Sequence, residues 1–423
     1  MELNTDSDNT AGIPQQHLWV SAYLDRSKKL PITFNIHATR LFETWEKEEL
    51  LKPHAYRIRS LHFKASEGSL ANIIWMQMGK NMPMPSLEEF ETEISGSSCI
   101  SMNGKLATDE NIIPPVSDGL VFWNHWKPTG LTKLRLDTTL LFNKPDLDEI
   151  YHALSTTCLT LHHLEYQGLI GSLDDDEANT AGRSHLEFPE LRSLAVLCND
   201  DMVPLLQLLI IPALDSLTIR DFITYPATTL NPIEEMDVDE FTFDPNGLFL
   251  VIKQWTTITN LEIYGLDMSD SEFPDDMSQA LPEMLEYIKA LDNLSSLVLY
   301  GIGVATSIAR TLFTHKEPLL PNLSRFLLGI SETRMSTDAS DTDDHQDDLT
   351  DYLNTRRRHQ LPRLRKLSIN LGYFRRLNNL NPSPVGVLWE SSDEIFIFAD
   401  PEVNKFIPIE EISIRLHEVQ AIY

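Results

Sequence analysis

The sequence predicts an α/β fold, a solenoid of strand–helix units with a curved parallel sheet on the concave face and helices on the convex face. Three observations lead to this fold class. A short apolar spacing, clearest in LTKLRLD at 131–137, recurs along most of the chain. Segments with helical periodicity lie between its copies. The 423 residues are also enough to bury a large shared core.

The recurring motif is an apolar residue followed by two more at the third and fifth positions after it. In LTKLRLD these are Leu131, Leu134 and Leu136, and the last two have the spacing of a strand. Copies begin at Ile58, Leu87, Leu131, Leu161, Leu191, Leu214, Ile258, Leu294, Leu323, Leu364 and Ile409. The copies lie roughly 23 to 45 residues apart, longer and less regular than the tightest leucine-rich repeats. Residues 58–423 are therefore predicted to form an irregular leucine-rich-repeat solenoid.

The N-terminal part has a different composition. Residues 1–17 are polar and acidic, which predicts a disordered arm. Residues 18–57 form a predicted cap, in which apolar and polar residues alternate over 30–36 as in a strand, followed by a helix over 41–51. A further helix is expected over 69–79. The copy at Leu87 predicts only a weak strand, because Thr92 stands where an apolar residue would complete it.

Strand and helix alternate from there onward. Helices are predicted at Leu147–Thr157, Val203–Ile210, Leu248–Trp255, Leu281–Ala290, Ala305–Phe313 and Leu349–Arg357. A single unit cannot bury its apolar face, so neighbouring units should join theirs into one column. That column is predicted to contain Leu134, Leu164, Leu194, Leu217, Leu261, Leu297, Phe326 and Leu367.

Glycine at the same offset after three strands, at Gly168, Gly265 and Gly301, lets the chain turn off the sheet. The acidic segments 172–184, 224–244 and 331–348 are predicted loop insertions.

Charge and cysteine content restrict partners and compartment. With 34 basic and 63 acidic side chains the formal net charge is −29, which disfavours nucleic acid and anionic membrane as partners. The main basic run, Arg356–Arg358 with Arg363, Arg365 and Lys366, follows an acidic segment that partly neutralises it. Three cysteines lie far apart, without a disulfide or zinc pattern, and no apolar run approaches the ~20 residues of a membrane span. A cytoplasmic or nuclear protein is expected.

The sequence contains no enzyme motif. There is no glycine-rich phosphate loop before a helix, no His-Glu-x-x-His and no Gly-x-Ser-x-Gly, so we expect no catalytic residues, cofactor or metal. Adjacent His162 and His163 would face opposite sides of a strand, and Asp174–Glu177 lacks the spacing of a calcium loop. Ser340 and Thr342 precede acidic residues, which leaves two interpretations of 331–348 open: a phosphorylated regulatory segment or a solubilising linker.

The remaining candidate site is the face of the sheet that the helices leave uncovered. Side chains between the buried apolar ones project to this face, because strand side chains alternate. The candidate protein-binding residues are Lys133, Arg135, Asp137, His163, Glu165, Gln167, Arg220, Glu262, Tyr264 and Tyr300. Tyr264 and Tyr300 share one offset in successive units, so they should lie on nearby strands. Paired aromatics beside Arg and Glu predict a binding hot spot, with simple packing on the strand face as the open alternative.

The segment Leu18–Ile36, LWVSAYLDRSKKLPITFNI, adds a resemblance. It is similar to the stretch that follows the F-box in the fungal F-box and leucine-rich-repeat proteins, especially those of mushroom-forming fungi, with Leu-Trp and then Arg-Ser before a Leu-Pro strand. The irregular repeats over Ile58–Ile414 resemble the substrate-binding region of that family. The F-box itself should precede Leu18, where only 1–17 stand, so we expect a truncated gene model or a paralogue without the ligase link.

Two functions follow as hypotheses. The resemblance implies a non-catalytic recognition solenoid that acts as substrate receptor of an F-box ubiquitin ligase, with a Skp-type adaptor and cullin as partners only if an F-box lies upstream. The net charge of −29 favours the alternative, a free-standing acidic leucine-rich-repeat binder of a basic protein.

Overall fold

The computed structural model describes part of the chain, and the structural statements below concern that part. The described residues are 2–3, 13–38, 51–65, 84–94, 130–137, 145–168, 183–198, 202–221, 245–264, 282–300, 308–309, 311–313, 315–329, 346–370, 387–388, 390–398 and 414–415. The chain divides into two compact units, each described by itself. Unit 1 contains residues 1–196, 204–213 and 229–234, and unit 2 contains 197–203, 214–228 and 235–423.

The described elements up to residue 210 are strands with helices between some of them. They are β1 (Glu2–Leu3), α1 (Ile13–Ser27), β2 (Ile32–Ala38), the 3-10 helix η2 (Lys52–Arg57), β3 (Ile58–Ala65), β4 (Glu89–Ile94), β5 (Lys133–Asp137), α5 (Leu147–Ser155), β6 (His163–Gln167), β7 (Leu186–Glu187), β8 (Ser193–Cys198), α6 (Met202–Gln207) and β9 (Leu209–Ile210). The pairs from β1 to β6 are parallel and follow chain order.

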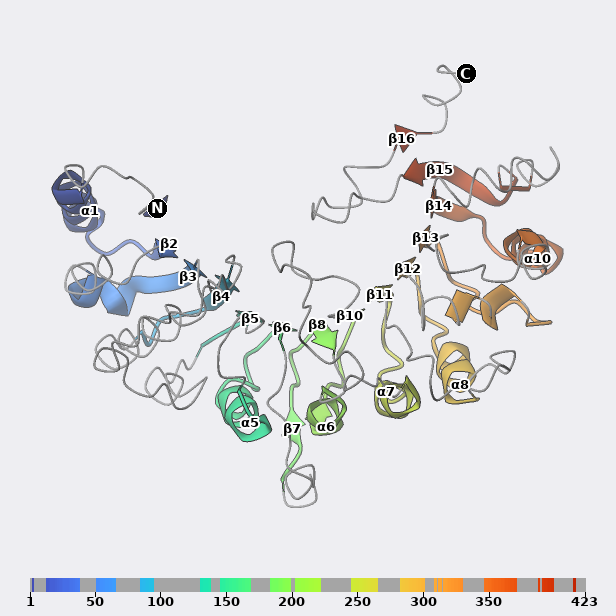
Figure 1. The fold of residues 1–423 in the computed structure, drawn as a ribbon, viewed down its shortest axis with the longest axis horizontal. Coiled ribbons are helices and arrows are strands. Elements are labelled where there is room, and N and C mark those ends of the chain that lie inside the picture. Colours follow the sequence, from blue (N-terminus) through green and yellow to red (C-terminus); the bar gives the residue numbers. More distant parts are fainter. Residues whose placement is uncertain are drawn as a thin grey trace, which may run out of the picture. The chain divides into compact units, whose positions relative to one another are not determined.

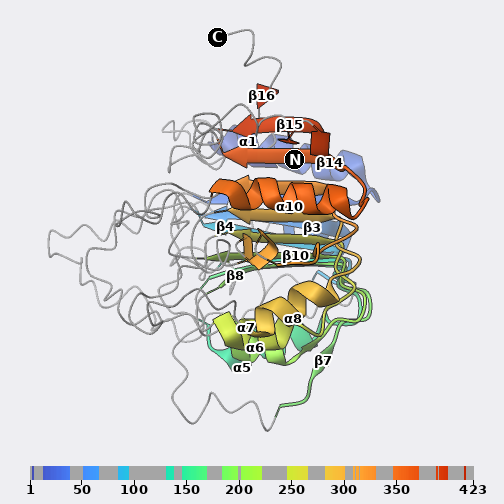
Figure 2. The same ribbon diagram turned by 90° about the vertical axis from the view of Figure 1, so that its right-hand side faces the viewer.

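The described elements of unit 2 are again strands with helices between some of them. They are β10 (Ser216–Asp221), α7 (Pro245–Ile252), β11 (Asn260–Tyr264), α8 (Pro282–Ala290), β12 (Ser296–Tyr300), β13 (Arg325–Gly329), α10 (Gln346–Arg358), β14 (Leu364–Asn370), β15 (Ser392–Phe398) and β16 (Ile414–Arg415). Pairing is parallel from β10 to β15, and β16 joins β15 antiparallel. In this unit α7 and α8 lie on the same side of the strands (Figure 1), and α10 runs alongside β14 (Figure 2). The predicted α/β class with a large parallel sheet is thus confirmed.

The predicted column of apolar residues is confirmed within each unit. Side chains that face one another in register on neighbouring strands are almost completely buried. In unit 1 the row contains Phe34, Leu61, Phe90, Leu134 and Leu164. In unit 2 it contains Leu217, Leu261, Leu297, Phe326 and Leu367. The two rows run across β2 to β6 and across β10 to β14, so no single strand–helix unit among them has a core of its own.

Thr92 explains why the sequence predicts only a weak strand at β4. Its side chain is buried and lies beside Phe63 in the parallel register, at a position where the other strands carry apolar residues. Its hydroxyl donates to the carbonyl of Arg135 at 3.4 Å. A buried hydroxyl that finds an acceptor costs little, so the strand forms despite the interruption.

In several copies of the motif, the residue after the first leucine carries a hydroxyl group that donates to a backbone carbonyl of the preceding copy. These residues are called the hydroxyl ladder. Thr132 donates to the carbonyl of Glu88 at 3.1 Å in unit 1. In unit 2, Ser295 donates to Thr259 at 3.1 Å and Ser324 to Ser295 at 3.0 Å. Each of these carbonyls also accepts two backbone N–H groups from the same neighbouring strand. The ladder therefore holds successive copies in one register at the start of each strand.

Two buried arginines satisfy backbone carbonyls of the preceding segment. In unit 1, Arg57 of η2 donates to the carbonyls of Leu24 and Lys28 at the end of α1. In unit 2, Arg356 of α10 donates to the carbonyls of Leu320 at 2.7 Å and Leu323 at 3.0 Å. The exposed fractions of these arginines are 5% and 3%. Because buried carbonyls need donors, Arg57 joins η2 to the end of α1, and Arg356 joins α10 to the loop that precedes β13.

Several predicted elements differ from the structure. The helix predicted over Val203–Ile210 ends at Gln207, because Leu209 and Ile210 pair as β9 with Leu186–Glu187. Strand β15 is not predicted, since no leucine spacing precedes it. Helix α1 begins at Ile13, inside the predicted arm 1–17.

Other predictions fall largely or wholly outside the described residues. Of the predicted helix 41–51 only Leu51 is described, and helix 69–79 and Ile409 are not described. The insertion 224–244 is also outside, and only Arg183 and Ser184 of 172–184 are inside. Residues 346–348 of the third insertion form the start of α10.

Candidate protein-binding faces

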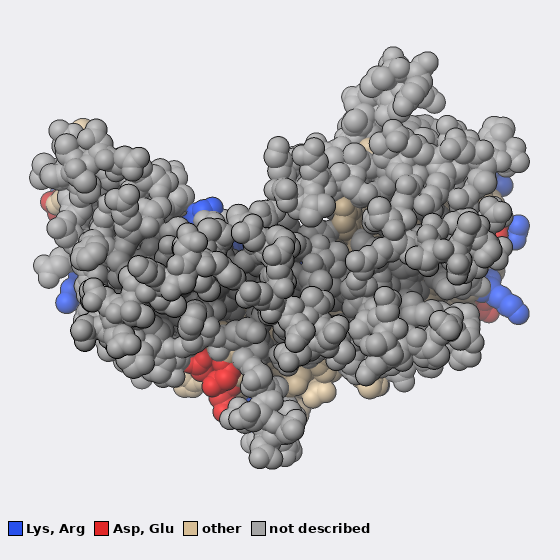
Figure 3. All heavy atoms as spheres, viewed as in Figure 1, with Lys and Arg blue, Asp and Glu red and all other residues tan. Residues whose placement is uncertain are grey.

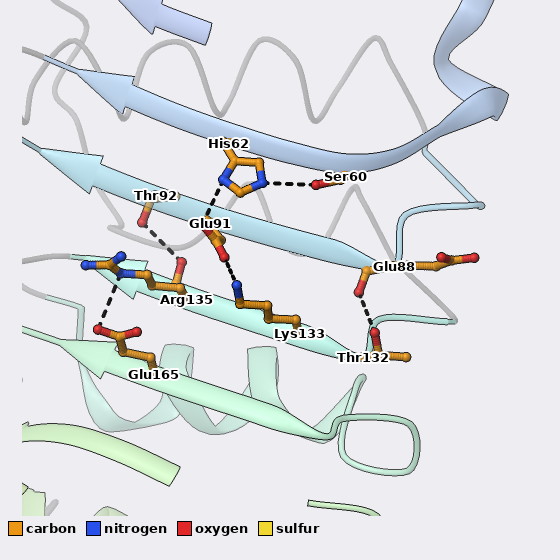
Figure 4. A network of polar contacts seen from close by, with 9 residues as sticks. All are labelled: Ser60, His62, Glu88, Glu91, Thr92, Thr132, Lys133, Arg135 and Glu165. Atoms are coloured by element: carbon orange, nitrogen blue, oxygen red, sulfur yellow. Dashed lines mark hydrogen bonds and ion pairs between the residues drawn. The ribbon is translucent and has the colours of Figure 1, made fainter. Parts of the chain in front are cut away.

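A row of charged side chains crosses β3, β4, β5 and β6 of unit 1 on one face of the sheet (Figure 4). The parallel register aligns His62, Glu91, Arg135 and Glu165 on successive strands. His62 Nδ1 lies 2.7 Å from Glu91 Oε2, and Lys133 forms an ion pair with the same carboxylate. Arg135 Nε lies 3.4 Å from Glu165 Oε1. Opposite charges on neighbouring strands therefore compensate one another along the row.

Glu91 is the centre of this charged row. Its side chain is 15% exposed. Burial alone would raise the pKa of Glu91, but the hydrogen bond from Lys133 and the electrostatic interactions with His62, Lys133 and Arg135 outweigh it and lower that pKa. Glu91 is thus held as a carboxylate between three basic side chains.

Ionised Glu91 should stabilise unit 1 in a defined range of pH. Its folded pKa lies below the unfolded value of about 4.3, so the stabilisation is present above that value and is lost as the pH falls through the folded pKa. Glu91→Gln should therefore flatten the decline of the melting temperature on acidification below about pH 5. Thermal unfolding across this pH range measures it. The matched control is Glu88→Gln. It removes a carboxylate that is 44% exposed and pairs with Arg59, and it should retain the wild-type dependence of the melting temperature on pH.

The row also contains a hydroxyl, an imidazole and a carboxylate in sequence. Ser60 Oγ lies 3.1 Å from His62 Nε2, while Nδ1 of the same ring contacts Glu91. This order is that of a nucleophile, a base and an orienting acid. Ser60 is buried, however, and the Glu91 carboxylate is shared with Lys133, so the contacts fit a strand-face network better than an accessible nucleophile.

A second cluster lies on β10, β11 and β12 of unit 2 and is called the tyrosine cluster: Arg220, Glu262, Tyr264 and Tyr300. The register aligns Arg220, Tyr264 and Tyr300 on adjacent strands. The two tyrosine rings are 6.1 Å apart between centroids and tilted by 41°. The Arg220 guanidinium lies 5.2 Å from the centre of the Tyr264 ring, within the range of a cation–π contact.

Glu262 connects the tyrosine cluster to its polar neighbours. Its Oε2 accepts hydrogen bonds from the Tyr264 hydroxyl at 3.1 Å and from Thr218 at 3.4 Å. Burial, and then the nearby negative charge of Glu262, raise the pKa of Tyr264, so its hydroxyl stays a donor at neutral pH. The Tyr264 side chain therefore contacts Arg220, Tyr300 and Glu262, and its residue remains partly exposed.

The structure brings most of the predicted site residues together within their own unit. Register pairs Lys133 with His163, and Gln167 donates to Glu165. Asp137 lies opposite Gln167 in the register, but its side chain is outside the described residues. In the tyrosine cluster, Arg220, Glu262 and Tyr300 each contact Tyr264, and the two tyrosines lie on adjacent strands as expected. The sequence did not single out His62 or Glu91, although the copies at Ile58 and Leu87 place both on the same face.

The basic run predicted near residue 356 does not form a free stripe. Arg356 is buried, Arg357 pairs with Glu390, and Arg363 Nη1 lies 3.6 Å from Asp393. Within the described ranges, no group of three or more His, Cys, Asp or Glu side chains could hold a metal ion. Over the same ranges, no helix has the length and apolar character to cross a membrane. The adjacent His162 and His163 are both exposed.

Comparison with known proteins gives no family for the chain, since no protein-family model and no curated protein matches it. Function must therefore be inferred from the side chains of each unit.

Proposed function

We propose that the protein is a non-catalytic protein-recognition solenoid that binds its ligand through the strand face carrying the tyrosine cluster. The supporting observation is a set of contacts across three adjacent parallel strands, in which the partly exposed Tyr264 contacts both Arg220 and the partly exposed Tyr300. Tyrosine and arginine dominate binding hot spots because they combine apolar area with directed polar groups. Side chains that are already ordered lose little further entropy on binding, which favours affinity.

The resemblance of Leu18–Ile36 to the segment after the F-box extends the proposal. In this form the solenoid is the substrate-receptor part of an F-box ubiquitin ligase, and a Skp-type adaptor and cullin join it where an F-box is present. The irregular repeat over 58–423 supports the receptor part of this proposal. Co-purification of adaptor and cullin with the tagged full-length chain tests the ligase link separately from substrate binding.

The binding proposal is tested with Tyr264→Ala/Tyr300→Ala. A protein that co-purifies with wild type is first identified, and its affinity is then measured by calorimetry for both chains. We expect binding to weaken tenfold or more while the melting temperature stays nearly unchanged. The matched control is Tyr151→Ala in α5, which also removes a half-buried tyrosine with a hydrogen-bonded hydroxyl and should bind as wild type. A large loss of stability with unchanged affinity would show that the two rings serve packing.

Charge supports the alternative, an acidic binder of a basic protein. The chain carries a net charge of −29. In unit 1 the first turn of α5 is acidic, and Figure 3 shows acidic side chains gathered where α5 lies. A basic ligand held by these charges would lose affinity steeply with salt, whereas a ligand of the tyrosine cluster would respond weakly. Repeating the calorimetry at two salt concentrations separates the two functions.

A further inference from the structure

Helix α1 presents large apolar side chains to solvent. Trp19 is 75% exposed and Tyr23, one turn later, is 54% exposed, while Leu24 on the opposite side is completely buried. Arg26 is exposed at the next position of the same stripe, and Leu30, 65% exposed, lies three residues after the last helical residue. Positions 19, 23 and 26 fall on one helical face because they are spaced by four and three residues. The four residues are called the α1 stripe.

The α1 stripe has the composition of a binding surface. Tryptophan, tyrosine and arginine are the three residue types enriched in binding hot spots. Large apolar side chains that are exposed together, and not singly, indicate contact with another molecule. Anchors at spacings of four and three residues are those with which a helix fills an apolar groove of another protein.

Charge around the α1 stripe indicates what kind of groove fits. The segment has three exposed basic residues, Arg26, Lys28 and Lys29, and one exposed acidic residue, Asp25. It is therefore locally positive in a chain of net charge −29. A partner with carboxylates at the rim of its groove complements that local charge. An anionic membrane surface fits less well, because the net charge of the whole chain opposes its approach.

We propose that α1 docks through the α1 stripe into an apolar, carboxylate-rimmed groove of a partner protein. Trp19 and Tyr23 enter the groove, and Arg26 with Lys29 pairs with the rim. This contact is independent of the tyrosine cluster, because it uses other residues, which lie in unit 1 and not in unit 2.

Calcium-loaded calmodulin is a suitable probe, because it presents an apolar groove with acidic surroundings to basic amphipathic helices. Titration of the full-length chain with calmodulin should show calcium-dependent binding with a Kd on the order of micromolar. Trp19→Ala/Tyr23→Ala should weaken it tenfold or more, and Arg26→Glu/Lys29→Glu should weaken it and reduce its salt dependence. The matched control is Leu159→Ala, which removes a side chain 69% exposed elsewhere in unit 1 and should leave binding unchanged.

Three outcomes would overturn the proposal. The first is no calcium-dependent binding at about 100 µM calmodulin, or binding that survives the Trp19→Ala/Tyr23→Ala change. The second is self-association of the wild-type chain in sedimentation equilibrium that this double change abolishes, since a second copy would then cover the α1 stripe. The third is binding to phosphatidylserine-containing vesicles without binding to calmodulin. Circular dichroism of each variant confirms that the chain remains folded.

Discussion

Replacing Arg356 with leucine is expected to lower the free energy of unfolding by about 3 kcal/mol. The guanidinium donates to the buried carbonyls of Leu320 and Leu323 and contacts the Tyr352 ring at 5.8 Å. A leucine fills much of the space but removes both guanidinium donors. The Leu320 carbonyl keeps its hydrogen bond from the Leu323 N–H, whereas the Leu323 carbonyl loses its donor, and a buried acceptor left without a partner costs about 1–3 kcal/mol. Urea unfolding followed by tryptophan fluorescence measures the change.

The neighbouring arginine supplies the control for this prediction. Arg357 is about half exposed and pairs with the exposed carboxylate of Glu390, so Arg357→Leu should change stability by less than about 1 kcal/mol. Arg356→Lys should fall between the two, because an ammonium keeps the charge but cannot reach both carbonyls as a planar fork does. Equal losses for Arg356→Leu and Arg357→Leu would contradict the role assigned to the buried guanidinium.

Replacing Leu297 with alanine is expected to cost about 2–5 kcal/mol. Leu297 is 1% exposed and lies in register between Leu261 and Phe326, so its removal leaves a cavity in the row shared by the strands of unit 2. The same urea titration measures it. Val298→Ala is the control, because Val298 projects to the other face and is only half-buried. A loss for Val298→Ala as large as that for Leu297→Ala would show that the core face is wrongly assigned.

Most of the strands could be predicted from the sequence because their residues repeat a simple spacing. The alternation within LTKLRLD and its copies depends only on the two-residue period of a strand, which no distant contact can change. Strand β15 is not predicted, because its sequence SDEIFIF lacks the leucine that comes before the strand in the other copies. Only its pairing with β14 identifies it as a strand. Leu209 and Ile210 were assigned to a helix because apolar periodicity is ambiguous over short runs, and pairing with β7 decides their state.

The candidate site was predictable in part. The common offset of Tyr264 and Tyr300 predicts both rings on one face, and the parallel pairing of β11 with β12 then brings them into contact. The burial of Arg356 could not be predicted, because a run of arginines in a sequence indicates a solvated basic segment. Only the fold decides which of these arginines enters the core. Glu91 was missed for a similar reason: its charge is compensated by His62 and Lys133 from neighbouring strands, 29 and 42 positions away in the printed sequence.

The sequence by itself determined the strand–helix alternation, the parallel sheet and the apolar rows, because these follow from local periodicity repeated many times. The tertiary structure alone decided which polar residues meet. Hydroxyl ladders, buried guanidinium groups and the charged row of unit 1 each join residues far apart in the chain. Their energies depend on distance and burial, which the order of the amino acids does not contain until the strands are aligned.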